Sequence, residues 1–117
     1  MPRTILTPTE ITAAGVAPSF VAADQANGMQ FNNDGHTLLE VKDTGGGACT
    51  VTISANGSKV AGGAITIPNL TVSVPATTGD RLIGPFDCSI FNQAGGVVYV
   101  DFSTGTGVTI TGYHINV

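Results

Sequence analysis

Residues 71–103 constrain the fold of this chain more than any other stretch. Short apolar runs follow one another there, most regularly from Val98 to Phe102, and each run ends at Pro, Gly, Asn or Asp. Alternation with a period of two between turn-forming residues is typical of half-buried antiparallel strands, because successive side chains of a strand point to opposite faces. This stretch therefore predicts several short strands.

Strand-like patterns also occur elsewhere, at residues 29–31, 36–42, 48–54 and 64–74. In the clearest of them, Cys49, Val51 and Ile53 are expected to face inward, and the glycines at 45–47 predict a hairpin loop before this strand. The spacing of the runs is typical of sandwiches and jelly rolls. We therefore expect an all-β fold, an antiparallel β-sandwich or jelly roll of about seven to eight strands.

The end of the chain contains two apolar sets of opposite strand parity: Val108 and Ile110, then Tyr113, Ile115 and Val117. Gly112 lies between the two sets. A one-residue bulge at Gly112 would keep both sets in the core, and it would place His114 on the outside. The pattern predicts such a bulge.

The first residues differ from the rest, and we expect residues 1–28 to form an extended N-terminal arm and residues 29–117 a β-sandwich domain. Thr7, Pro8 and Glu10 predict the start of a short helix, with Thr7 as N-cap, and Gly15 would end it. A helix of this length is marginal alone, so it needs a surface on which to dock. The arm either contacts a neighbouring subunit or closes one end of its own sandwich.

The surface is expected to be poor in charge. Charged residues make up 10% of the 117, against about 25% in an average soluble domain, and Gly and Thr contribute sixteen residues each. Such a surface suits a protein that packs against neighbours. The alternative is a monomer that Thr, Ser and Asn keep in solution.

The charge pattern argues against several partners. The net charge is −4, and the four basic residues are scattered along the chain, so we expect no nucleic-acid partner. Apolar runs are too short to cross a bilayer, so we expect no membrane association. The N-terminus lacks the basic-then-apolar pattern of a secretory signal, which predicts folding in a cytoplasm.

The two cysteines fit a cytoplasmic setting. Cys49 and Cys88 each share strand parity with apolar neighbours, which predicts two buried free thiols. A disulfide between them is the alternative. No paired CxxC spacing predicts a zinc site.

No motif for catalysis occurs in the sequence. Most carboxylates fall in expected turns, and His36 and His114 lie on well-separated expected strands. A calcium site at 32–35 or 43–45 would have too few carboxylates, so a plain turn is the better interpretation. We expect no enzyme activity, no metal and no cofactor.

Apolar and aromatic side chains are the best candidates for a contact surface. Tyr99 has the opposite parity to the inward set of its strand, and Phe91 lies at the mouth of a loop. Together with apolar residues of the arm they give the candidate subunit or capsid contacts: Ile5, Leu6, Ile11, Phe20, Phe91 and Tyr99.

Several segments resemble small structural proteins of tailed bacteriophages: residues 2–8, 36–41, 72–76, 81–86, 90–92 and 98–103. The resemblance covers nearly the whole chain, and its motifs are structural. It implies a capsid decoration (cement) protein, a compact β-sandwich that binds the outer surface of a phage head and clamps neighbouring capsomers.

That resemblance also implies partners and a location. The partner would be the major capsid protein, the chain would form a homo-oligomer, with a trimer favoured, and it would join the virion after folding in the host cytoplasm. The alternatives are another virion component, such as a head fibre base, a head–tail joining protein or a tail protein, and a carbohydrate-binding module.

Overall fold

The computed structural model describes residues 2–57, 59–63 and 65–115, and it is mostly β-structure, as expected. Its elements are β1 (Thr4–Ile5), β2 (Thr9–Ile11), β3 (Val21–Ala22), β4 (Met29–Asn32), β5 (Thr37–Asp43), β6 (Cys49–Ile53), β7 (Lys59–Val60), η1 (Ala61–Gly63), β8 (Ile65–Thr66), β9 (Leu70–Val74), β10 (Gly79–Ile83), α1 (Cys88–Phe91), β11 (Val97–Phe102) and β12 (Val108–Ile115). These are twelve strands rather than seven or eight, and four of them have only two residues.

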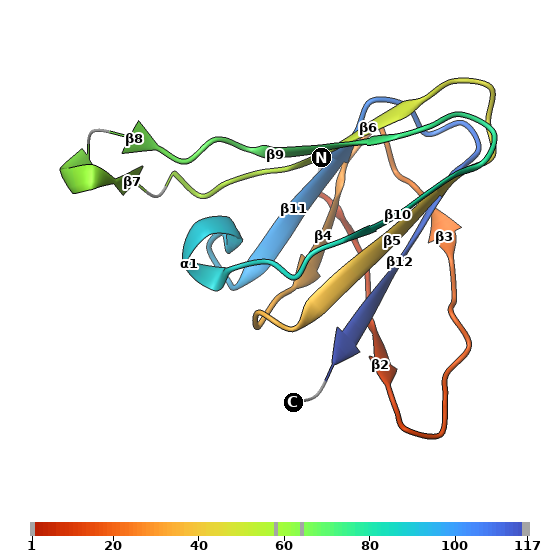
Figure 1. The fold of residues 1–117 in the computed structure, drawn as a ribbon, viewed down its shortest axis with the longest axis horizontal. Coiled ribbons are helices and arrows are strands. Elements are labelled where there is room, and N and C mark those ends of the chain that lie inside the picture. The colour runs from red at the N-terminus through yellow and green to blue at the C-terminus, as the bar shows by residue number, and fades with distance from the viewer. Residues whose placement is uncertain (1, 58, 64, 116–117) are drawn as a thin grey trace.

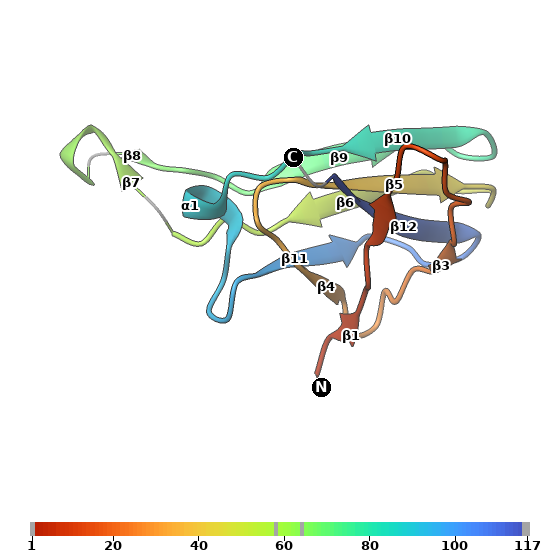
Figure 2. The ribbon, with the colours of Figure 1, turned by 90° about the horizontal axis from the view of Figure 1, so that it is seen from below.

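Two sheets contain most of the strands, in keeping with an all-β sandwich (Figure 1). The first sheet has the order β1-β4-β11-β6-β9, and the second has β10-β5-β12-β2, with β3 also paired to β12. Both sheets are mixed, because β1 pairs parallel to β4 and β2 parallel to β12, whereas the other pairings are antiparallel. The short hairpin β7–η1–β8 extends away from both sheets, at the left of Figures 1 and 2.

The core lies between the sheets and follows the predicted alternation. Strands β5, β6 and β11 alternate buried residues with half-buried or exposed ones, which confirms the inward set of Cys49, Val51 and Ile53. Phe86 packs on Phe31, with ring centres 5.6 Å apart, and both side chains are almost fully buried. Burying a large apolar side chain contributes about 1.5–3 kcal/mol to stability, so these strands hold the sheets together.

The loop at residues 45–47 is not a hairpin loop, so that prediction is wrong. It joins β5 of the second sheet to β6 of the first. From β3 to β12 the chain changes sheet at every step within the two sheets except between β6 and β9. Local glycine spacing predicts the turn but says nothing about which sheet the next strand enters.

The predicted helix at the N-terminus is also wrong, because Thr9–Ile11 forms strand β2 beside the end of β12. The segment before it pairs with β4, where the Leu6 N–H donates to the Gln30 carbonyl at 2.8 Å. In these pairings the backbone groups of the segment find partners that an isolated helical turn would leave to water. Residues 3–11 therefore pass from the edge of the first sheet to the second sheet of the same chain.

Strand β12 has no bulge, so the prediction at Gly112 is wrong. Its pairing with β5 runs without interruption from Val108 opposite Asp43 to His114 opposite Thr37. Tyr113 and Ile115 therefore face outward, and His114 shares the inward parity of the buried Ile110. Gly112 is itself buried, and a Cβ there would reach about van der Waals contact with Pro8. The expected position of Val117 lies outside the described residues.

Cys88 was expected on a strand, but it begins the one-turn helix α1. Asp87 caps this helix by accepting the Ser89 N–H, and its pKa is lowered by the hydrogen bonds from Ser89. Cys49 is buried, Cys88 is half-buried, and both thiols are free. The disulfide alternative is not the arrangement seen.

Candidate functional site

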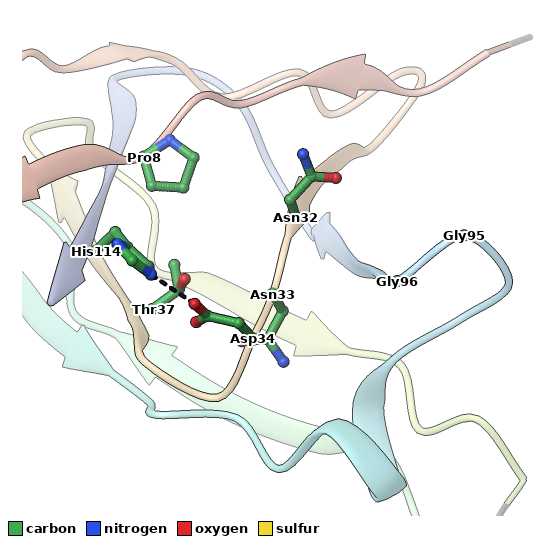
Figure 3. A pocket seen from close by; sticks show the side chains of 8 residues that line it. All are labelled: Pro8, Asn32, Asn33, Asp34, Thr37, Gly95, Gly96 and His114. Carbon is green, nitrogen blue, oxygen red and sulfur yellow. Dashed lines mark hydrogen bonds and ion pairs between the residues drawn. The ribbon is translucent and has the colours of Figure 1, made fainter. Parts of the chain in front are cut away.

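An open groove of about 480 Å³ lies at one edge of the sandwich (Figure 3). Its lining comes from the N-terminal segment, the turn between β4 and β5, the loop before β11 and the end of β12: Pro8, Asn32, Asn33, Asp34, Thr37, Gly95, Gly96 and His114. Amides, a carboxylate, a hydroxyl and an imidazole thus meet in one hollow.

The imidazole of His114 bridges two carboxylates. Its Nδ1 lies 2.8 Å from Glu10 Oε1, and its Nε2 lies 2.7 Å from Asp34 Oδ2 (Figure 3 draws the second contact). Ionised carboxylates only accept hydrogen bonds, so the ring can donate to both of them only as an imidazolium, with a proton on each nitrogen. The hydrogen bond to Asp34, and then the one to Glu10, raises the pKa of His114.

The other side of this contact is the turn before β5. The pKa of Asp34 is lowered, first by its hydrogen bond with His114 and then by the backbone N–H of His36. The His36 ring lies 3.7 Å from the second oxygen of Asp34, so both histidines face the same carboxylate. The turn is therefore held by charge as well as by its backbone.

Two asparagines fix the wall of the groove. The buried Asn33 donates from Nδ2 to the Phe86 carbonyl at 3.1 Å and to Asn92 Oδ1 at 2.7 Å. Asn92 returns a bond from its own Nδ2 to the Asn33 carbonyl at 3.1 Å. This network ties the turn before β5 to the end of α1.

Thr37 lines the groove and is almost fully buried, at 1% exposed. Its hydroxyl has no hydrogen-bond partner within residues 2–57, 59–63 and 65–115. A buried hydroxyl without a hydrogen-bond partner lowers the stability of the folded state. The Thr37 hydroxyl therefore does not stabilise the fold, and its role can be tested by substitution.

Three of the arm residues predicted as contacts differ sharply in exposure. Ile5 is 72% exposed and Ile11 is 41% exposed, whereas Leu6 is only 5% exposed and belongs to the core. Leu6 therefore holds the segment on its own sandwich. Phe20 is half-buried, and the ammonium of Lys42 lies 4.7 Å from its ring centre.

The two predicted contacts outside the arm are half-buried and already contact other side chains of the same chain. The Arg3 guanidinium lies 4.2 Å from the ring centre of Tyr99 and pairs with Asp101 at 2.9 Å. Phe91 packs edge-on against Phe86, with ring centres 5.9 Å apart. The predicted contact residues are divided between the two sheets: Ile5 and Tyr99 flank Gln30 on one face of the first sheet, whereas Ile11 lies on the second.

Sequence reasoning named only Ile11 from a second, more continuous surface. The register of β10, β5, β12 and β2 places five apolar or aromatic side chains on the outer face of the second sheet, here called the outer apolar patch: Ile11, Leu38, Leu82, Tyr113 and Ile115. Leu82 is 70% exposed and Ile115 is 36% exposed. A hollow of about 220 Å³ beside the patch adds Pro85 and His36 to its border.

One polar contact crosses the outer apolar patch. The Tyr113 hydroxyl donates to Glu40 Oε1 at 2.7 Å, and burial together with this bond raises the pKa of Tyr113 to about 12. The sequence did contain a signal for the patch, because β12 has apolar residues of both strand parities. The predicted bulge at Gly112 assigned all of them to the core and so left none for the outer face.

Within the described residues, no group of three His, Cys, Asp or Glu side chains has the geometry to hold a metal ion. In the same part of the chain, no helix has the length and apolar character required to cross a membrane.

Comparison with protein-family models finds no match, and none of the curated proteins or solved structures compared is significantly similar to this chain. The function therefore has to be argued from the surface and the groove.

Proposed function

We propose that this chain is a capsid decoration protein, which binds the outer surface of a phage head and stabilises the shell by clamping neighbouring capsomers. The observation that carries the proposal is the outer apolar patch, with Leu82 at 70% and Ile115 at 36% exposed on a regular sheet. Exposed apolar side chains clustered on a rigid face are typical of protein-contact surfaces. The low charge of the chain, at 10%, favours the same use.

The strand pairing supports a jelly roll as the finer description of the fold. Four antiparallel pairs are nested along the chain: β6–β9, β5–β10, β4–β11 and β3–β12. The pairings of β11 with β6 and of β12 with β5 join these pairs into two four-stranded sheets. In this interpretation eight strands make the jelly roll, an architecture found in viral capsid and lectin domains.

The proposed mechanism requires no catalytic group. A protein that binds the mature lattice and not its separated parts shifts the equilibrium toward the lattice by mass action. We propose the major capsid protein as partner and a homotrimer as the favoured oligomer, because several linked contacts would give avidity. The chain would fold in the host cytoplasm and then join the outer surface of the virion.

Imaging tests this proposal directly. The purified chain is mixed with undecorated capsids of its own major capsid protein, and regular density on the shell is expected. Leu82→Ser is expected to weaken binding strongly. Ile65→Ser, at a 55% exposed position on β8 outside the patch, is the matched control and should bind like the unchanged chain. Bare capsids in the presence of the unchanged chain would contradict decoration.

Two alternatives have distinct outcomes. Density confined to the neck, the fibres or the tail of intact virions would indicate another virion component, such as a head–tail joining protein. A carbohydrate-binding module is favoured by the polar groove, where Asn32 and Asp34 are exposed beside Thr37. Saturable binding on a glycan array, lost in Asn32→Ala but kept in Leu82→Ser, would support that module instead.

A further inference from the structure

His114 connects three segments that are far apart in the sequence. It lies on β12, and its two partners are Glu10, 104 residues away on β2, and Asp34, 80 residues away in the turn before β5. Asp34 and His114 line the groove together with Pro8 of the N-terminal segment (Figure 3), and Glu10 contacts the other ring nitrogen of His114. A single proton on the imidazole therefore affects the contacts between three elements.

The segment that Glu10 belongs to is held at several points. Strand β1 pairs with β4 over two residues, and β2 pairs with β12 over three. Arg3 and Leu6 anchor the beginning of the segment through the ion pair with Asp101 and through burial. At the β2 end, Ile11 is 41% exposed, so apolar burial does little there.

We propose that His114 is a pH-dependent latch: its imidazolium form holds strand β2 against β12, and loss of the ring proton releases β2 while β1 and Leu6 stay docked. A neutral imidazole has one N–H, so it can donate to only one of the two carboxylates. The other carboxylate then faces a ring nitrogen lone pair, and Glu10 and Asp34 lose the cation between them. The loss falls on the end of the segment that has the weakest apolar anchoring.

The charged groups around the His114 ring determine whether its protonation strengthens or weakens the docking of β2. Glu10 faces it from β2, Asp34 from the turn before β5, and His36 lies behind Asp34 at 3.7 Å. The Tyr113–Glu40 pair belongs to the outer face of the same sheet and not to the groove.

The pH window follows from these contacts. Because the pKa of His114 is raised in the folded chain, the latch contributes fully below the ordinary value of 6.5 and is lost as pH rises through the raised value. At the acid end, the lowered pKa of Asp34 keeps that acceptor ionised as pH falls below its usual range.

The latch does not depend on the proposed function, because it concerns the isolated chain. The test follows the His114 ring by NMR in His36→Gln, which leaves a single histidine to titrate. Amide exchange of residues 9–11, corrected for its intrinsic pH dependence, is measured on the same sample, with β5 as the internal reference. Protection of β2 is expected to fall severalfold across the His114 midpoint, while protection of β5 stays constant.

Two variants complete the test. Glu10→Gln removes one charge at a 51% exposed carboxylate, so the fold should survive, and the His114 midpoint is expected to drop. His114→Gln is expected to leave β2 poorly protected at every pH. A midpoint at or below the ordinary value, or protection of β2 that ignores the midpoint, would overturn the proposal. If His114→Gln does not fold, Glu10→Gln and the titration still decide.

Discussion

The docking of the N-terminal segment depends on Leu6, and Leu6→Ala tests how strongly. Leu6, directly after β1, is 5% exposed, whereas its neighbour Ile5 at the end of β1 is 72% exposed. The substitution removes about three carbon atoms from the core, and each buried methylene contributes about 0.8 kcal/mol. That gives about 2.4 kcal/mol before any cavity is counted.

The position of Leu6 sets the size of the cavity term. Leu6 borders an open hollow of about 450 Å³, which Met29 and Val21 also line, so neighbouring side chains have room to move. Sites that can relax lie near the lower end of the range for Leu→Ala substitutions. The expected loss in the free energy of unfolding is therefore about 2–3 kcal/mol.

Urea denaturation of both variants checks this value. Ile5→Ala is the matched control and should cost less than about 1 kcal/mol, because its side chain is already in water. Both variants should keep the m-value of the unchanged chain. If Leu6→Ala costs no more than Ile5→Ala, the segment is not part of the cooperative fold. A loss of oligomers without a loss of stability would instead favour an arm that docks on a neighbour.

Three further substitutions test named contacts in the same denaturation assay. Arg3→Gln removes the ion pair with Asp101 and is expected to cost about 1 kcal/mol or less, with a smaller loss in high salt; a loss that does not change with salt would contradict the role of charge. Asn33→Ala breaks the buried network and is expected to cost about 2 kcal/mol, whereas Asn32→Ala, at an exposed position, should be nearly neutral; equal costs would refute the importance of the network. Thr37→Val replaces a buried hydroxyl that lacks a partner in the described residues, so it should leave stability unchanged or raise it by about 1 kcal/mol; a clear loss would show that the hydroxyl has a partner, such as bound water.

The strands of the core could be predicted because local and global preferences agree there. In β6 apolar residues alternate with threonines, and in β5 and β11 most of the inward positions are apolar; the structure buries Leu39, Val41, Val98, Val100 and Phe102 there. Such segments have few competing arrangements, since a one-residue slip would bring every polar side chain inside.

The N-terminal helix was wrong because its evidence was entirely local. The capping pattern of Thr7, Pro8 and Glu10 is worth about 1 kcal/mol. Pairing of Thr9–Ile11 with β12 and burial of Leu6 together outweigh it. A short helix with no partner surface loses to a strand that completes an existing sheet.

The site could not be predicted because it depends on which way β12 faces. Apolar residues were assumed to be buried, and that assumption required a bulge at Gly112. The second sheet in fact has apolar residues on both faces, so Tyr113 and Ile115 face outward and the uninterrupted register turns His114 toward the groove. Its partners Glu10 and Asp34 are 104 and 80 residues away in the sequence, so no local sequence pattern could predict these contacts.

The central place of β12 has a consequence for the order of folding. It is the last strand of the described chain, yet β2, β3 and β5 all pair with it. During synthesis these three strands leave the ribosome before β12 exists, so the edges that pair with β12 are unpaired. The second sheet can form completely only after most of the chain has been synthesised. Closing such distant pairs is entropically costly and slow, so a nascent chain without β12 exposes unpaired strand edges that invite aggregation. Loss of the residues from Val108 onward is thus more damaging to this fold than the small share of the sequence that they make up would suggest.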